Sequence, residues 1–72
     1  MRETVKIETP FIRLDDLLKM TGVAMTGGQA KIMIQGGEVL VNGEVCPMRG
    51  KKLRPGDLVA VPHEGKEIDI AY

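Results

Sequence analysis

The stretch TGGQAKIMIQGGEVLVNGEV, residues 26–45, decides the fold because its apolar residues change from a helical spacing to an alternating one. Thr26 and Gln29 have the spacing of a capping box, in which the Thr26 hydroxyl accepts from the Gln29 amide and the Gln29 side chain returns to the Thr26 amide. An apolar stripe follows at 30–34, and Gly36 with its neighbouring glycine ends the pattern. The stretch therefore predicts a helix that begins after Thr26.

The second half of this stretch predicts a β-hairpin. Val39 and Val41 alternate with other residues, which places both on one face of a strand. Asn42 and Gly43 follow, and they are the residue pair that a two-residue hairpin turn favours, because both turn positions need a positive φ. Pro47 lacks a backbone N–H, so the segment after the hairpin is expected to be an edge or a loop.

Outward from this stretch, the remaining elements are also short. Leucines 14, 17 and 18 have helical spacing and Gly22 supplies a stop, which predicts an amphipathic helix that starts near Arg13. Alternating apolar residues predict further strands at 4–7 and 67–70, and the run 58–61 predicts a strand that is apolar on both faces. The order predicts an α+β fold in which two short helices pack on one face of a small antiparallel β-sheet.

Length and composition limit what such a chain can be. Its 72 residues, 43% of them apolar, allow one small domain over residues 1–72. The longest apolar run, 58–61, is far shorter than the roughly 20 residues of a membrane-spanning helix, and the first ten residues hold no apolar signal core. We therefore expect a soluble, cytoplasmic protein without a membrane partner. With only Cys46 and His63 as soft ligands, we expect no metal and no cofactor.

Charge is balanced in total but uneven along the chain. Ten Lys and Arg residues offset ten Asp and Glu residues, so attraction to a nucleic acid must come from local placement. The segment 49–54 holds four cations and no acid, namely Arg49, Lys51, Lys52 and Arg54. A loop with several cations can bind the phosphates of a nucleic acid. The alternative is a solvated loop that happens to be basic.

The start of the second helix is another candidate phosphate site. Gly27 and Gly28 leave the first amides uncovered by side chains, the helix dipole is positive there, and Lys31 lies one turn inside. Alternatively, the glycines serve only a tight turn into the helix. Residues 27–29 also spell the Gly-Gly-Gln tripeptide of release factors, but capping already accounts for Gln29, so we set the catalytic reading aside.

No arrangement of catalytic residues is recognisable, so we expect no enzymatic activity. Asp15 and Asp16 are neighbours about 100° apart on a helix, and the helix dipole accounts for both. Cys46 is interpreted as a small packed hydrophobic residue rather than a nucleophile. Methionines 20, 25 and 33 are expected to fill gaps around the two helices.

Four segments in this order resemble the alpha-L RNA-binding domain first named from bacterial ribosomal protein S-four. They are RLDDLL at 13–18, TGGQAK at 26–31, GEVLVNG at 37–43, and Gly56 with Asp57 before an apolar strand. The resemblance covers about residues 12–61. The TGGQAK segment and the RGKKL run at 49–53 are similar to the small stand-alone members of the YaaA/YbcJ type. The resemblance implies RNA binding and a role in ribosome maturation.

In that family, RNA lies against the start of the second helix, the exposed side of the first and the loop after the hairpin. Together with the basic run, the resemblance nominates as RNA-binding residues Lys19, Thr26, Gly28, Gln29, Lys31, Arg49, Lys51, Lys52 and Arg54. Many family members carry an arginine directly after the capping residue, where this chain has Gly27. The start of the second helix is therefore expected to bind phosphate more weakly than in those family members, and the basic loop is expected to contribute more of the RNA affinity.

The function expected from these features is non-enzymatic binding of structured RNA by a monomer. The RNA partner is expected to be ribosomal RNA or a pre-ribosomal particle, recognised through phosphates and shape. Only Phe11 and Tyr72 are aromatic, and helical RNA, unlike single strands, needs no stacking platform.

Two other readings remain. Asn42 and Gly43, followed by Gly56 and Asp57, also resemble β-grasp interaction modules, although the chain does not end in the Gly-Gly of sulfur carriers. A helix-turn-helix that binds DNA is the weaker reading, because the segment 27–36 offers only three long polar side chains.

Overall fold

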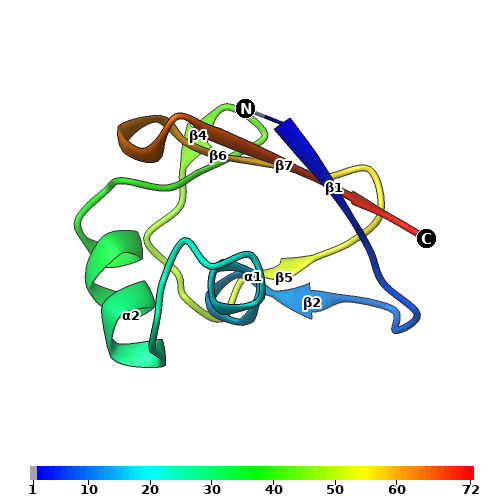
Figure 1. Cartoon of the computed structure of the whole chain (residues 1–72), viewed down its shortest axis with the longest axis horizontal. Helices are drawn as coiled ribbons and strands as arrows, with labels where there is room; N and C mark the ends of the chain where they lie inside the picture. The colour runs from blue at the N-terminus through cyan, green and yellow to red at the C-terminus, as the bar shows by residue number, and fades with distance from the viewer. Residues whose placement is uncertain (1) are drawn as a thin grey trace.

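The computed structural model describes residues 2–72, which form a sheet with helices on one face (Figure 1). The five-stranded sheet has the order β1 (Arg2–Lys6), β7 (Lys66–Ala71), β6 (Leu58–Val61), β3 (Leu40–Val41) and β4 (Glu44–Val45). The helices are α1 (Leu14–Met20) and α2 (Gly27–Gln35), and a 3-10 turn, η1 (Pro62–Glu64), joins β6 to β7. A second sheet pairs β2 (Ile12–Arg13) with β5 (Lys52–Leu53).

The predicted α+β fold is confirmed, with one difference in the sheet. Four of its five strands pair antiparallel, but β1 runs parallel to β7, with Arg2 opposite Glu67 and Val5 opposite Ile70. The sheet is therefore mixed rather than antiparallel. Parallel neighbours need a long crossover, and here the whole chain between the two strands supplies it. No short turn signal in the sequence could have specified this pairing.

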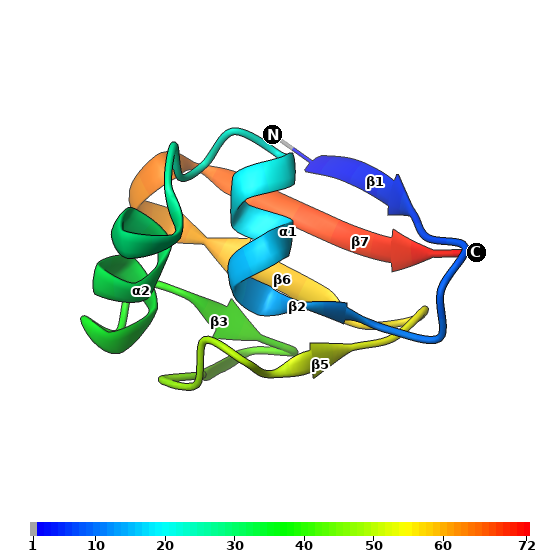
Figure 2. The same ribbon diagram turned by 90° about the horizontal axis from the view of Figure 1, so that it is seen from below.

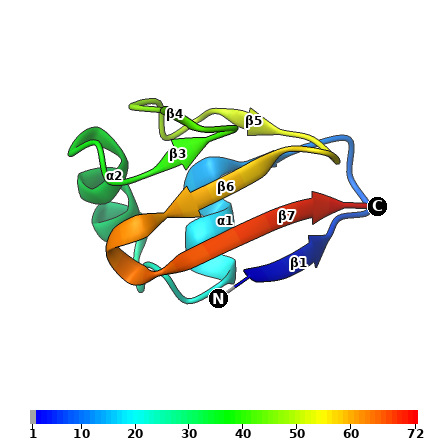
Figure 3. The same cartoon turned by 90° about the horizontal axis from the view of Figure 1, so that it is seen from above.

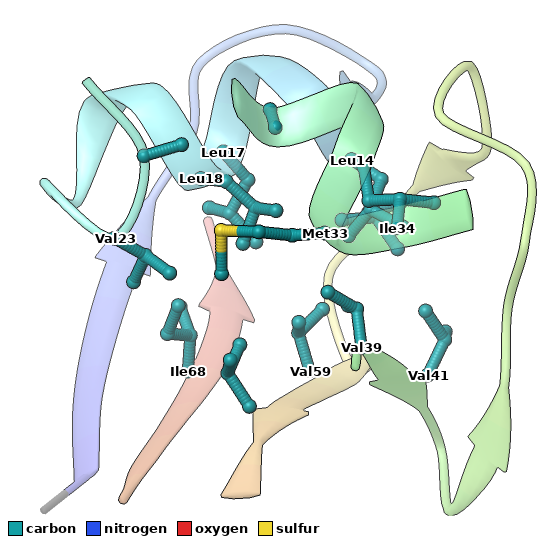
Figure 4. Packing of buried hydrophobic residues seen from close by; sticks show 14 of the residues in the cluster. Leu14, Leu17, Leu18, Val23, Met33, Ile34, Val39, Val41, Val59 and Ile68 are labelled. Atoms are coloured by element: carbon teal, nitrogen blue, oxygen red, sulfur yellow. The ribbon is translucent and has the colours of Figure 1, made fainter. Parts of the chain in front are cut away.

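The core lies between the helices and the large sheet. Figure 4 shows Leu14, Leu17 and Leu18 of α1 and Ile34 of α2 pointing toward the sheet. Facing them are the inward side chains of the sheet and of the segment before it, Val39, Val41, Val59, Val61, Ile68 and Ile70. Each fully buried leucine or isoleucine stabilises the fold by about 1.5–3 kcal/mol relative to exposure. The helical spacing seen in the sequence thus identified the inward faces.

One of the predictions about methionine is confirmed and two are wrong. Met33 is buried and fills space between α2 and the sheet. Met20 and Met25, however, are 62% and 82% exposed. Met20 is the last residue of α1 and Met25 lies just before α2 begins, so neither side chain lies between the helices and the sheet.

None of the helices within residues 2–72 has the length and apolar character needed to cross a membrane.

The predicted hairpin turn is confirmed and is tied to a second turn. Asn42 and Gly43 have φ values of 52° and 87° between β3 and β4. The Asn42 side-chain amide donates to Asp57 Oδ1 at 3.0 Å, and the side-chain oxygen Oδ1 of Asn42 accepts from the Leu58 amide at 2.9 Å. Asp57 Oδ2 also accepts from the Arg54 amide at 2.9 Å. The two turns therefore form one unit at this end of the sheet.

This unit predicts that Asn42→Ala lowers the free energy of unfolding by about 2 kcal/mol, because alanine loses both hydrogen bonds and disfavours a positive φ. Urea unfolding measures the change. Asn42→Gly is the matched control: it tolerates the turn and loses only the hydrogen bonds, so it should be the less destabilised variant. An alanine variant within about 0.5 kcal/mol of the parent would show that the two turns are not coupled.

Candidate nucleic-acid interface

The loop that carries the basic run is attached to the start of α1. The side chain of Arg13, the residue before this helix, forms no capping hydrogen bond. Instead, the Lys51 carbonyl accepts from the Leu14 amide at 2.9 Å and the Arg49 carbonyl accepts from the Asp15 amide at 3.1 Å. The amides at a helix start need such partners. The backbone of the basic loop is thereby held against α1, while the side chains of Arg49 and Lys51 stay exposed.

Arg13 is a cation of this site that sequence reasoning missed. Its guanidinium Nη2 lies 3.0 Å from Asp15 Oδ2, and a Cβ atom placed on Gly50 would lie 3.7 Å from that nitrogen. Asp15 is buried, and its Oδ1 accepts from the Asp16 amide, so it does more than complement the helix dipole. In the two-stranded sheet, Arg13 of β2 lies opposite Lys52 of β5. The sequence shows that Arg13 lies two residues before Asp15 at the start of a helix, which favours their ion pair, but it does not show that Arg13 lies beside Gly50.

The start of α2 is capped as predicted, with one correction. Thr26 Oγ1 accepts from the Gln29 amide at 3.1 Å. The Gln29 side chain, however, accepts from the Met25 amide at 2.7 Å rather than from the Thr26 amide. The extended backbone of Thr26 brings the preceding amide within reach of the Gln29 side chain. A Cβ atom added to Gly28 would have only Thr26 Oγ1 within 4 Å, at 3.9 Å, so the start of the helix is open to solvent.

The cations differ in how far nearby acids neutralise them. Lys19 forms an ion pair with Asp16 at 3.4 Å. In the described part of the chain, no ion pair involves the other exposed cations of the predicted site, Lys31, Arg49, Lys51, Lys52 and Arg54. The Lys52 ammonium lies 4.9 Å from the centre of the Phe11 ring. Their charge is therefore available to an anionic partner.

Asp57 follows the basic run 49–54, and its carboxylate lies close enough to Lys51 and Arg54 to interact with their charges. Partial burial raises the pKa of Asp57, but hydrogen bonds from the Arg54 amide and the Asn42 side chain and the charges of Lys51 and Arg54 outweigh this effect and lower its pKa overall. Asp57 is thus ionised at neutral pH and partly offsets the field of Lys51 and Arg54.

The fold brings the predicted residues to one side of the large sheet. Figure 1 shows α1, α2 and the loop before β5 below the large sheet, and Figure 2 views the molecule from this side, with strands of the large sheet behind the helices. All nine predicted residues are exposed or, for Gly28, open to solvent. Contact of each residue with RNA stays a prediction. Among residues 2–72, no three His, Cys, Asp or Glu side chains are grouped so as to hold a metal ion.

Comparison with known proteins places this arrangement in a family. A model of the S4 domain matches residues 5–71. The chain belongs to the S4 domain family. It is 41% identical over 61 residues to the "Probable ribosome maturation protein RlbA" of Bacillus subtilis (strain 168), a match that covers 85% of this chain and 86% of that protein.

Longer relatives match this chain over part of their length. The chain is 34% identical over 58 residues to small ribosomal subunit protein uS4 of Thermodesulfovibrio yellowstonii, covering 81% of this chain and 28% of that protein. It is also 34% identical over 53 residues to protein uS4c of Aethionema cordifolium, covering 74% of this chain and 26% of that protein. The match thus spans about a quarter of these ribosomal proteins. Family membership favours the RNA-binding reading over the β-grasp and helix-turn-helix readings.

The capping geometry predicts that Thr26→Ala lowers the free energy of unfolding by about 1 kcal/mol, because the Gln29 amide loses its acceptor. Thermal or urea unfolding measures this loss. Thr26→Asp keeps an acceptor and should unfold like the parent. If the alanine variant were as stable as the parent, the hydroxyl would not cap α2.

Proposed function

We propose that this protein binds structured RNA through phosphate contacts, without enzymatic activity, and acts in ribosome maturation in the cytoplasm. The observation that carries the proposal is the anchoring of the basic loop to α1 by the Arg49 and Lys51 carbonyls. This anchoring holds several cations beside the helices before RNA arrives. Binding then requires little ordering of the loop, which lowers its entropic cost.

The proposed ligand is RNA with helical segments. Helical RNA is recognised through phosphates, 2′-hydroxyls and shape, whereas single strands are bound largely by stacking on aromatic side chains. The chain has two aromatic residues, and the Phe11 ring already lies under the Lys52 ammonium. Fixed cations beside two helices therefore suit a phosphate backbone better than a run of unpaired bases.

The ribosomal context rests on the relatives. One is named as a ribosome maturation protein and two as proteins of the small ribosomal subunit. The proposed partner is accordingly ribosomal RNA or a pre-ribosomal particle. We further propose that residues 1–72 act as one RNA-binding domain and as a monomer, without a cofactor or metal.

A salt titration with an RNA stem-loop tests the proposal. If about four to six phosphates are contacted, log K should fall against log [salt] with a slope of magnitude roughly 3 to 5. An unpaired pyrimidine strand of equal length should compete poorly with the stem-loop. A slope near zero, or tighter binding of the unpaired strand, would contradict phosphate recognition of structured RNA.

Removal of a cation from the basic run 49–54 should weaken RNA binding but leave the stability of the fold unchanged. Lys51→Ala and Lys52→Ala should each lower the affinity about fivefold near physiological salt and reduce the salt slope by about 1, because each loses one phosphate contact. Lys6→Ala is the matched control, since it removes the same charge from β1 at the opposite edge of the large sheet from β4. Equal losses in all three variants would indicate a non-specific effect of net charge.

An added carboxylate tests the start of α2. Gly28→Glu places a negative charge where a phosphate is proposed, so RNA affinity should fall although an acid at a helix start stabilises by roughly 0.3–1 kcal/mol. Tyr72→Glu adds the same charge at an exposed residue far from α2 and should bind like the parent (Figure 2). If a folded Gly28→Glu variant bound RNA as tightly as the parent, the start of α2 would not be part of the RNA surface, and residues 26–29 would only cap the helix.

A further inference from the structure

A groove of about 800 Å³ lies between the β3–β4 hairpin and β5. In Figure 3, β4 and β5 lie at the same edge of the molecule, and in Figure 1, β4 is at the level of the large sheet while β5 is at the level of α1. The groove is therefore the space at this edge where the chain crosses from one sheet to the other. Its volume falls within the range of about 300–1,000 Å³ that is typical of small-ligand sites.

The two walls of the groove differ in chemistry. The wall formed by the hairpin and the residues after it includes the apolar residues Val45, Pro47 and Met48, together with the carboxylate of Glu44. Val45 is 56% and Met48 63% exposed, so this apolar surface is not covered by the fold. The other wall carries Lys51, Lys52 and Arg54. A ligand that fills the groove must combine a flat apolar part with an anionic part, and a nucleotide has both.

The polar groups at the end of the groove are already committed to one another. Asn42 and Asp57 line it, but the Asn42 side chain bonds to Asp57 and to the Leu58 amide, and Asp57 also accepts from the Arg54 amide. These groups hold the groove in shape, and their side chains bond to one another and to neighbouring amides. We expect a base to be held mainly by apolar contact with Val45 and Met48, with little regard to its identity.

Lys51 connects this groove to the proposed RNA surface. Its carbonyl accepts from Leu14 at the start of α1, while its side chain lines the groove. We infer that the groove holds one unpaired nucleotide that swings out of an RNA helix bound beside α1 and α2. Its base lies on Val45 and Met48, and its phosphate lies by Lys51 and Arg54. This inference rests on the proposed function and names the feature of the RNA that would be recognised.

The experiment compares an RNA stem-loop with the same stem-loop that carries one unpaired nucleotide, by fluorescence anisotropy at fixed salt. The parent should bind the bulged RNA about fivefold more tightly, because the base leaves water and contacts the apolar side chains of Val45 and Met48. A bulge with an abasic nucleotide should lose this preference, because it keeps the flexible backbone but has no base. Bulged adenine and bulged uracil should bind alike to within about twofold.

Two variants test whether the preference for the bulged RNA arises in the groove. Met48→Ser should reduce the preference for the bulged RNA to less than about twofold while leaving the affinity for the paired stem-loop unchanged. Met20→Ser is the matched control, because Met20 is equally exposed but lies at the end of α1, outside the groove. Both residues are on the surface, so both variants should retain the parent melting temperature.

Several results would overturn the inference and leave the proposed function standing. They are equal affinity of the parent for the bulged and paired RNA, a preference that the abasic bulge retains, or a preference that Met48→Ser does not change. Binding of an acidic peptide that Met48→Ser weakens, without any preference for the bulge, would assign the groove to a protein ligand instead. Failure to bind either RNA would contradict the proposed function itself.

Discussion

The arrangement of this S4 domain depends on how the start of α1 obtains its hydrogen-bond acceptors. A helix of seven residues leaves a large share of its amides unpaired, and here the carbonyls of Arg49 and Lys51 supply the acceptors. One set of bonds thereby joins a helix near the N-terminus to a loop more than thirty residues later. The Arg13 and Asp15 ion pair beside Gly50 reinforces the same junction. The cations of the loop are positioned as a consequence of this backbone requirement.

Some of the residues that carry the family resemblance are structural, whereas the segments 26–31 and 49–53 also hold proposed RNA contacts. Asn42, Gly43 and Asp57 join two turns, and their polar groups bond to each other and to neighbouring amides. They fix the edge of the sheet from which the basic loop departs. One part of a family motif can therefore hold the fold together while other parts carry the proposed RNA contacts. The RNA surface follows from what this frame holds in place.

The sequence predicted the elements that local signals specify. The cap at Thr26, the turn at Asn42 and Gly43, and the leucine spacing of α1 each depend on residues a few positions apart, and each is confirmed. It failed where the partner is distant. The parallel pairing of β1 with β7 and the proximity of Asp57 to Lys51 depend on the completed fold. Arg13 was missed because its role requires Gly50 of the basic loop as a neighbour. The nine predicted RNA-binding residues remain a prediction.

Mapping of amide chemical shifts in the ¹⁵N-labelled protein during titration with an RNA stem-loop tests the central claim most directly. The claim is that the junction between α1 and the basic loop, together with the start of α2, forms the RNA surface. The largest shifts should therefore fall on residues 13–16, 26–31 and 49–54, with little change in β1 and β7. Shifts concentrated on β1 and β7, with the α1 start and the basic loop unchanged, would contradict the claim.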